Sequence, residues 1–182
     1  MRVEFGYAYG MAAAAVKPGM ADLIIDSPGS AQICRLNRSF AANCPGNCFI
    51  TLFAAVLDPA SGDLVYCNAG HNAPLLLRTN DEVEPLGATG LPLGIRRDAT
   101  YEQKSCHLEQ GDVLTLFSDG VTEACAPDGD EEFGEQRLVA VVQRKRNYPA
   151  VSLIEAINAE LLSFTQGAPP ADDITLVLAR RC

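Results

Sequence analysis

Two acidic residues stand at the ends of predicted buried strands, where their carboxylates could act together. Asp119 follows the apolar run 113–117 and precedes Gly120, and Asp172 lies just ahead of a second apolar run at 174–179. If these strands are antiparallel neighbours, both carboxylates lie at one edge of the sheet, where they repel each other unless a cation lies between them. Oxygen ligands alone select hard cations, so the pattern favours Mg²⁺ or Mn²⁺.

Such an ion would polarise a phosphoryl oxygen and activate water for direct attack on phosphorus, without a protein nucleophile. The sequence contains no G-x-S-x-G, Walker or H-E-x-x-H motif that would support a competing mechanism. Taken singly, each carboxylate is better explained as a solvated turn residue. Only their joint placement supports the metal site.

Three further polar residues are candidates for lining this site: Asp173, and the pair Asn68 and His71 in an NAGH turn at the end of a hairpin strand. The simpler interpretation of His71 is a hairpin residue that is hydrogen-bonded to a neighbouring loop. His107, in the middle of a predicted strand, is interpreted as structural. Cys67 lies inside a strand with no obvious base in the sequence, so it is not predicted to be a nucleophile.

The hydrophobic pattern predicts helices and antiparallel hairpins. The expected helices cover residues 10–25, with a break at Pro18 and Gly19, and residues 30–43, 135–146 and 151–164. The expected strands cover residues 49–57, 64–68, 74–78, 83–86, 101–107, 113–118 and 174–179. Short hairpin connections exclude a doubly wound parallel sheet and favour an α+β sandwich with helices outside. With no internal repeat and no long linker, residues 1–182 are expected to form a single domain.

Composition excludes several classes of protein. The net charge of −9 argues against a nucleic-acid surface, which needs a basic stripe. No apolar run approaches the length of a membrane span, so a membrane partner is not expected. Seven cysteines, an odd number without a repeated pair spacing, favour free thiols in a reducing compartment. The expected location is therefore cytoplasmic.

Five segments together resemble a known family, in unbroken order from about Gly10 to Arg181. They read FITLFAAVLDPASGDLVYCNAGHNAPLLL, LPLGI, GDVLTLFSDGVTEA, FGEQRL and ADDITLVLAR. The chain thereby resembles the PPM (PP2C-type) serine/threonine phosphatases, in the branch of the SpoIIE and RsbU regulators. The resemblance implies a PP2C-like fold, two antiparallel sheets forming a β-sandwich flanked by helices.

The resemblance also assigns roles to residues. It implies that Asp119, Gly120 and Asp172 belong to a manganese or magnesium site, and that Glu123 lies where a further, weaker metal binds in relatives. It implies substrates that carry phosphoserine or phosphothreonine, often small anti-sigma-factor antagonists of the STAS type.

One departure from the family pattern concerns the metal site. Family members carry a Gly-Asp-Val-Ser-Gly-His/Lys-Gly stretch before the first helix, and its Asp bridges two metals. Aligned on Gly10, this chain has Phe5 in that place, and phenylalanine offers no oxygen ligand, so a complete two-ion centre is not expected. The family's two preceding strands are also expected to be absent. Their absence predicts an exposed sheet edge that a homodimer would cover.

Two functional hypotheses follow from the residues and the resemblance. The first is a metal-dependent protein serine/threonine phosphatase that hydrolyses phosphoserine or phosphothreonine on a regulatory protein. The alternative is a catalytically inactive pseudophosphatase that binds such a protein without hydrolysing it. Replacement of the bridging Asp by Phe5 is what keeps the alternative open.

Overall fold

The computed structural model describes residues 3–9, 29–43, 48–129 and 131–182, and for residues 3–9 it describes the backbone alone. The predicted helix at 10–25 lies outside the described residues. The chain forms two compact units, each treated by itself below. Unit 1 consists of the described residues within Met1–Ala15, Pro74–Pro85 and Leu108–Cys182, and unit 2 of those within Val16–Ala73 and Leu86–His107.

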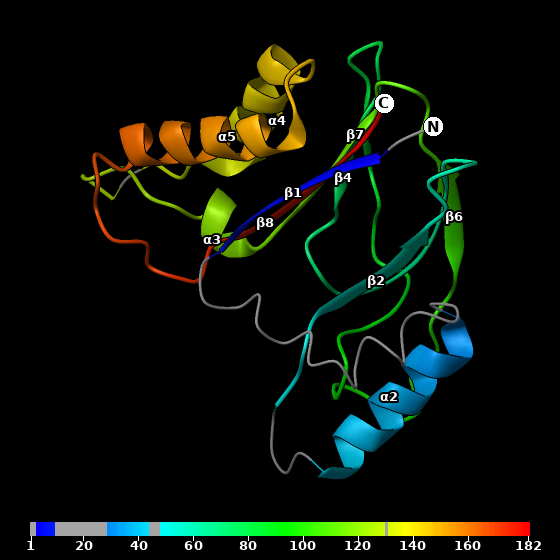
Figure 1. Ribbon diagram of the computed structural model, residues 1–182. Helices are drawn as coiled ribbons and strands as arrows, with labels where there is room; N and C mark the ends of the chain where they lie inside the picture. The colour runs from blue at the N-terminus through cyan, green and yellow to red at the C-terminus, as the bar shows by residue number, and fades with distance from the viewer. Residues whose placement is uncertain (1–2, 10–28, 44–47, 130) are drawn as a thin grey trace. The chain divides into compact units, whose positions relative to one another are not determined.

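Unit 1 is built on a five-stranded sheet in the order β1-β8-β7-β4-β5, and every neighbouring pair is antiparallel. Its strands are β1 (Val3–Tyr9), β4 (Leu75–Leu77), β5 (Val83–Pro85), β7 (Val113–Phe117) and β8 (Thr175–Arg181). Its helices are α3 (Asp119–Thr122), α4 (Gly134–Lys145) and α5 (Ala150–Phe164), and Figure 1 shows α4 and α5 together on one side of the sheet.

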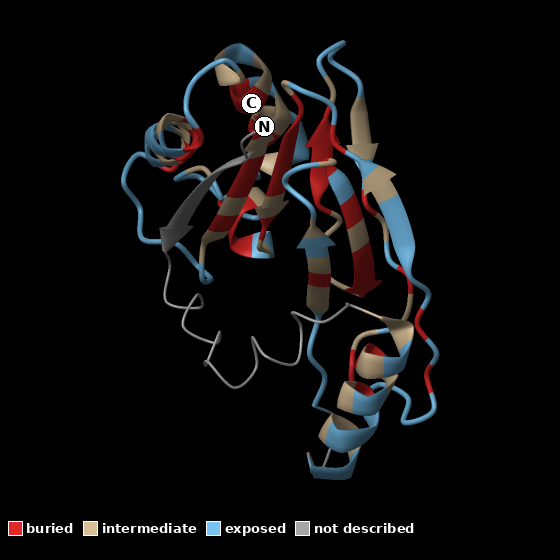
Figure 2. Cartoon of the chain, turned by 45° about the vertical axis from the view of Figure 1, so that its right-hand side comes forward, coloured by how far each residue is buried: buried red, intermediate tan, exposed pale blue. Residues whose placement is uncertain are grey.

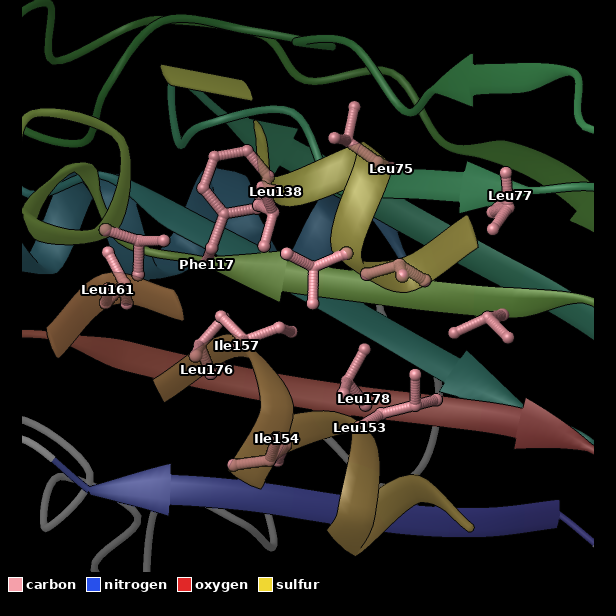
Figure 3. Close-up of a cluster of buried hydrophobic side chains, with 14 of the residues drawn as sticks. Leu75, Leu77, Phe117, Leu138, Leu153, Ile154, Ile157, Leu161, Leu176 and Leu178 are labelled. Atoms are coloured by element: carbon pink, nitrogen blue, oxygen red, sulfur yellow. The ribbon is translucent and has the colours of Figure 1, made fainter. Parts of the chain in front are cut away.

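The core of unit 1 lies between these two helices and the sheet (Figure 3). Helix α5 contributes Leu153, Ile157 and Leu161 at helical spacing, and the sheet contributes Phe117 and Leu176. All five side chains are almost completely removed from solvent. Because each buried side chain of this size contributes about 1.5–3 kcal/mol, packing of the amphipathic helices on the sheet is the main stabilising term.

Strand β1 was not among the elements expected from the sequence. Large apolar or aromatic residues at positions 3, 5, 7 and 9 alternate with Glu, Gly and Ala at positions 4, 6 and 8, so the period of a half-buried strand is present but was overlooked. The backbone of β8 is hydrogen-bonded to β7 on one side and to β1 on the other, and this pairing holds residues 3–9 in a strand. The predicted strand at 174–179 is thus confirmed and is an inner strand of the sheet.

Unit 2 contains helix α2 (Ser30–Asn43) and a three-stranded antiparallel sheet in the order β2-β3-β6. The strands are β2 (Leu52–Leu57), β3 (Asp63–Ala69) and β6 (Lys104–His107). Ile33 and Asn37 are the buried residues of α2, and Figure 2 shows the rest of this helix as partly or fully exposed. Both polar atoms of the buried Asn37 side chain are hydrogen-bonded. Its Nδ2 donates to the carbonyls of Arg96 and Arg97, and its Oδ1 accepts from the amide of Gly94.

Two predicted hairpins are confirmed, that of 49–57 with 64–68 and that of 74–78 with 83–86, with some strands shorter than expected. The third predicted hairpin, of 101–107 with 113–118, is wrong, because β6 pairs with β3 whereas β7 pairs with β4 and β8 in the other sheet. Residues 49–51 lie outside β2, although Ile50 forms an isolated bridge with Leu93, and residues 101–103 lie outside β6. The turn between β2 and β3 is closed by Asp58, whose carboxylate accepts from the amide of Ala60 at 2.8 Å. Within the described ranges, no helix has the length and apolar character needed to cross a membrane.

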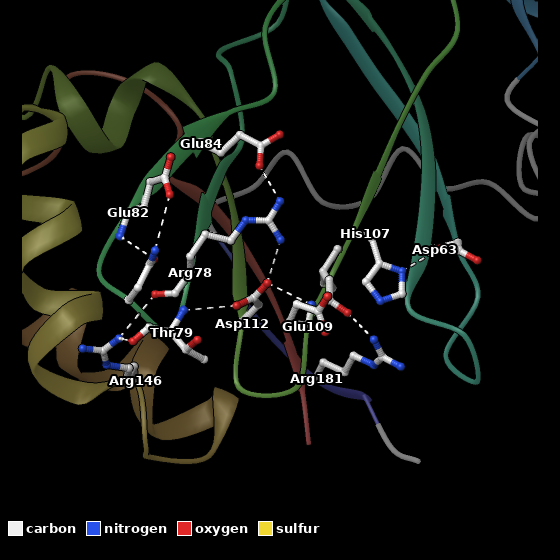
Figure 4. A network of polar contacts seen from close by, with 12 residues as sticks. Asp63, Arg78, Thr79, Glu82, Glu84, His107, Glu109, Asp112, Arg146 and Arg181 are labelled. Carbon is white, nitrogen blue, oxygen red and sulfur yellow. Dashed lines mark hydrogen bonds and ion pairs between the residues drawn. The ribbon is translucent and has the colours of Figure 1, made fainter.

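A buried ionic network holds the turn before β7 to the β4–β5 hairpin (Figure 4). Asp112 is 1% exposed and accepts from Arg78 Nη1 at 2.8 Å, from the amide of Thr79 at 3.2 Å and from the amide of Glu109 at 2.9 Å. Arg78 also pairs with Glu84. Burial lowers the pKa of Arg78, but its hydrogen bonds to Asp112 and Glu84 outweigh burial and raise that pKa above its ordinary value.

Replacing Asp112 by alanine is therefore expected to destabilise the protein by about 2–4 kcal/mol, because Arg78 loses its buried partner and two amides lose their acceptor. The free energy of unfolding in urea measures the effect. The control is Glu160→Ala, which removes an exposed pair with Arg144 and should change stability by less than about 1 kcal/mol. Equal losses for the two variants would contradict a structural role of the buried network.

Candidate metal site at the end of strands β7 and β8

The ends of β7 and β8 are joined by a serine. Ser118 follows the last residue of β7, and its amide donates to the carbonyl of Thr175 at 3.0 Å. Its hydroxyl donates to the carbonyl of Asp173 at 2.7 Å and accepts from the amide of Thr175 at 2.9 Å. Antiparallel pairing of Phe117 with Leu176 continues directly into these bonds. The predicted placement of the two acidic segments at one edge of the sheet is thus confirmed for the backbone.

Gly120 brings the two segments into direct contact. A Cβ atom built on this buried glycine would lie 2.5 Å from the carbonyl oxygen of Asp173 and 3.1 Å from that of Asp172. Backbone atoms cannot move aside as a flexible side chain can, so only glycine fits between α3 and the loop before β8. A glycine after a strand allows close approach to the backbone, and the structure shows that the approaching segment is the 172–173 loop.

The two carboxylates are exposed and are held by neighbouring amides. Asp119 Oδ1 accepts from the amide of Gly120 at 3.0 Å, and Asp172 Oδ1 accepts from the amide of Asp173 at 2.7 Å. Among the residues that the structure describes, the second oxygen of each carboxylate has no hydrogen-bond partner. An exposed pair of carboxylates on adjoining segments can hold a hydrated divalent cation, since Mg²⁺ is commonly bound by one or two carboxylates with water completing its coordination.

The ligand set for a metal is small. Among the residues that the structure describes, no group of three or more His, Cys, Asp or Glu side chains lies close enough to hold a metal ion. Asp119 and Asp172 therefore fit one hydrated hard cation better than a closed cage. Glu123 is exposed, and its amide donates to the carbonyl of Asp119 at 2.8 Å, so its backbone ends the short helix α3. Its predicted role toward a weaker metal remains a prediction.

The register of β1 against β8 places Phe5 away from the end at which the two acidic segments meet. In the pairing of β1 with β8, Tyr9 lies opposite Thr175, and Phe5 lies opposite Ala179. At roughly 3.3 Å per residue, Phe5 is about 13 Å along the strand from the end at which the acidic segments meet. The register thus places the backbone of Tyr9 at that end. The alignment of Phe5 with the family's bridging Asp stays a prediction from sequence.

Asn68 and His71 belong to unit 2. The Asn68 side chain is 0% exposed, and its Nδ2 donates to the carbonyl of Leu86 while its Oδ1 accepts from the amide of His71. His71 is half-buried, and its Nδ1 lies 3.3 Å from Thr51 Oγ1. These bonds support the interpretation of both residues as parts of the hairpin turn. Their predicted role in lining the site remains untested.

Cys67 behaves as a buried structural residue in the same unit. Its thiol is fully buried and donates to the carbonyl of Glu102 at 3.1 Å. Burial, and to a smaller extent the nearby Cys34, raises the pKa of the Cys67 thiol above its ordinary value. A raised pKa keeps the thiol protonated, which supports the expectation that Cys67 is not a nucleophile.

Replacing Gly120 by alanine should displace the 172–173 loop and destabilise the protein by about 1–3 kcal/mol, because the added methyl group overlaps backbone atoms. Thermal or urea unfolding measures this loss. The matched control is Gly87→Ala, where a Cβ would meet nothing within 4 Å and no loss of stability is expected. If Gly120→Ala is as stable as Gly87→Ala, the 172–173 backbone does not lie as close to Gly120 as described here.

Comparison with known proteins identifies relatives of the chain. The family model described as Stage II sporulation protein E (SpoIIE) matches residues 10–182. The phosphoserine phosphatase RsbU of Bacillus subtilis is 35% identical over 147 residues, which cover 80% of this chain and 43% of RsbU. Protein IcfG of Synechocystis sp. is 33% identical over 150 residues, which cover 81% of this chain and 23% of IcfG. The chain thus spans less than half the length of these two relatives.

Solved structures share the fold at low sequence identity. The PP2C phosphatase domain of SpoIIE from Bacillus subtilis, solved with a fragment of its regulatory domain, superimposes with a TM-score of 0.76 at 18% identity, over 98% of this chain and 62% of that one. The catalytic domain of the serine/threonine phosphatase PstP, solved in complex with two manganese ions, superimposes with a TM-score of 0.60 at 16% identity, over 98% of this chain and 99% of that one. The predicted α+β, PP2C-like fold is therefore confirmed.

Proposed function

Because this chain belongs to the SpoIIE family of PP2C-type phosphatases, we propose that it hydrolyses phosphoserine or phosphothreonine on a regulatory protein. The observation that carries the proposal is the meeting of the Asp119 and Asp172 segments at the joined ends of β7 and β8. RsbU, named a phosphoserine phosphatase, supports the same reaction class. An STAS-type anti-sigma-factor antagonist in the cytoplasm is the proposed substrate.

The proposed cofactor is Mn²⁺ or Mg²⁺. PstP was solved with manganese, which supports divalent-metal dependence in this fold. A bound ion would supply a Lewis acid for the phosphoryl oxygens and an activated water. Asp119 and Asp172 would hold it through their unused oxygens, and Ser118 and Gly120 would keep the two segments in place. Exposure of both carboxylates leaves the site open to a phosphorylated side chain on another protein.

The second candidate function is a protein-binding module without hydrolysis. Two observations favour it: the sequence alignment puts Phe5 in the place of the family's bridging Asp, and fewer than three metal-ligating side chains gather at any place in the described part of the chain. A domain with only two carboxylates could bind one ion and a phosphoprotein, yet lack the second ion that aligns the attacking water.

The decisive measurement is manganese-dependent hydrolysis of p-nitrophenyl phosphate. Asp119→Asn and Asp172→Asn should each lower kcat/KM by about 100-fold or more, because loss of a metal ligand removes several kcal/mol of transition-state stabilisation. Glu155→Gln removes an exposed acid of α5 and should retain activity. Metal-dependent turnover in the wild type that neither Asp variant reduces would refute the assignment of the site.

Titration calorimetry with Mn²⁺ separates the two candidate functions. A phosphatase should bind the ion in the wild type, lose binding in Asp119→Asn, and turn over substrate. A binding module should bind the ion, or a phosphoprotein, without metal-dependent turnover. Absence of both manganese binding and turnover would exclude the proposed metal site.

A further inference from the structure

Unit 1 contains a groove of about 680 Å³ that ends at the Asp172–Asp173 loop. Three segments form it: residues 124–127 after α3, residues 158–165 in the C-terminal half of α5, and residues 168–174 before β8. A volume of this size lies within the range of pockets that bind ligands. The mechanism proposed above uses none of the groove beyond its acidic end.

The groove is lined mainly by apolar side chains. Leu161 forms part of its buried base at 4% exposure, and Leu162 stands on its rim at 62% exposure. Leu162 is the most exposed of the large apolar side chains in the described parts of the chain. Pro169 and Pro170, which are exposed, also line it. Exposed apolar side chains grouped around a hollow are typical of a surface that binds another molecule.

The charge of the groove restricts what it can bind. Asp172 and Asp173 are the only charged residues among those that line it, and the chain as a whole carries a net charge of −9. A partner segment with acidic side chains would be repelled, and one with a basic side chain near this end would be attracted. The remaining length favours apolar side chains.

The groove is continuous with the candidate metal site. Asp172 and Asp173 are among its lining residues, and the carbonyl oxygens of the same two residues lie against Gly120, which follows Asp119. A phosphoseryl side chain placed at the two carboxylates would therefore direct the residues beside it into the groove.

We propose that this groove binds the segment that flanks the phosphoserine of the protein substrate, by accepting two or three apolar side chains and a basic side chain near Asp172 and Asp173. The inference rests on the proposed phosphatase function and adds a sequence preference to it. A substrate with acidic or glycine-rich flanks should bind poorly.

Peptide binding tests the groove independently of hydrolysis. The probes are fluorescent nine-residue peptides in which a phosphonate replaces the phosphate of phosphoserine, so that they cannot be hydrolysed, and binding is followed by anisotropy in the presence of Mn²⁺. Peptides with Leu, Val and one Arg beside the phosphoserine analogue should bind at least about tenfold more tightly than peptides with Gly and Ser. Peptides with Glu at the same positions should bind more weakly still.

Leu162→Asn should remove most of this preference and bring the two affinities to within about twofold, because it replaces an apolar rim side chain by a polar one without changing the charge of the groove. The matched control is Val151→Asn, which changes a similarly exposed apolar residue of the same helix, 58% exposed, outside the groove. This control should retain the tenfold preference. A wild type without preference, or a preference that Leu162→Asn retains, overturns the inference.

Thiol labelling provides a second test within one molecule. Cys125 is exposed and lines the groove, whereas Cys48 is exposed in unit 2. Saturation with the apolar peptide should slow alkylation of Cys125 several-fold and leave that of Cys48 unchanged, as measured by mass spectrometry. Equal rates at Cys125 with and without peptide overturn the inference.

Wild-type turnover of p-nitrophenyl phosphate separates the two proposals. Retained peptide preference without any turnover would overturn the phosphatase proposal and support the groove as a binding surface. Turnover without peptide preference would support the phosphatase proposal and overturn the groove.

Discussion

The backbone contact between the end of β7 and the start of β8 is the constraint on which the candidate site depends. Ser118 bonds both to Asp173 and to Thr175, and Gly120 allows a separation from the Asp173 carbonyl that no side chain could tolerate. These contacts join the Ser118 hydroxyl and the Gly120 backbone to backbone atoms of residues 173 and 175, so they do not depend on the positions of the two acidic side chains. Two acidic residues more than 50 positions apart in the chain are thereby held on adjoining segments.

The stability of that contact comes from the rest of unit 1. Helices α4 and α5 bury their apolar faces on the sheet that contains β7 and β8, and the Asp112 network holds the beginning of β7 in the same way that Ser118 holds its end. Strand β7 is thus fixed at both ends and buried along its length. Ordering mobile ligands around an ion costs conformational entropy, which lowers the affinity for the ion. Ligands at the end of a rigid strand are already ordered, so this cost is smaller.

Much of this architecture could be predicted from sequence because the signals are local. The apolar runs at 113–117 and 174–179 identify two inner strands, and the turn residues Asp58 and Gly62 identify the tip of a hairpin. Strand β1 also has a local signal, the alternation of large apolar with small or charged residues over 3–9, which was overlooked, whereas its pairing with β8, more than 160 residues away, could not be predicted from a local pattern. The groove beside α5 was also missed, since its three walls come from segments that are separate in the sequence.

The sequence by itself determined the residue types at the site, the family to which the chain belongs and two of the antiparallel hairpins, since each depends on motifs or on periodicity within a few residues. Only the tertiary structure decided that residues 172 and 173 are what lies against Gly120, that the buried Asn68 side chain bonds to Leu86 and His71, and that Phe5 lies four register positions from the residue of β8 that Ser118 binds. The physical reason is that close packing and strand register join backbone atoms that are distant along the chain, and no local pattern records those distances.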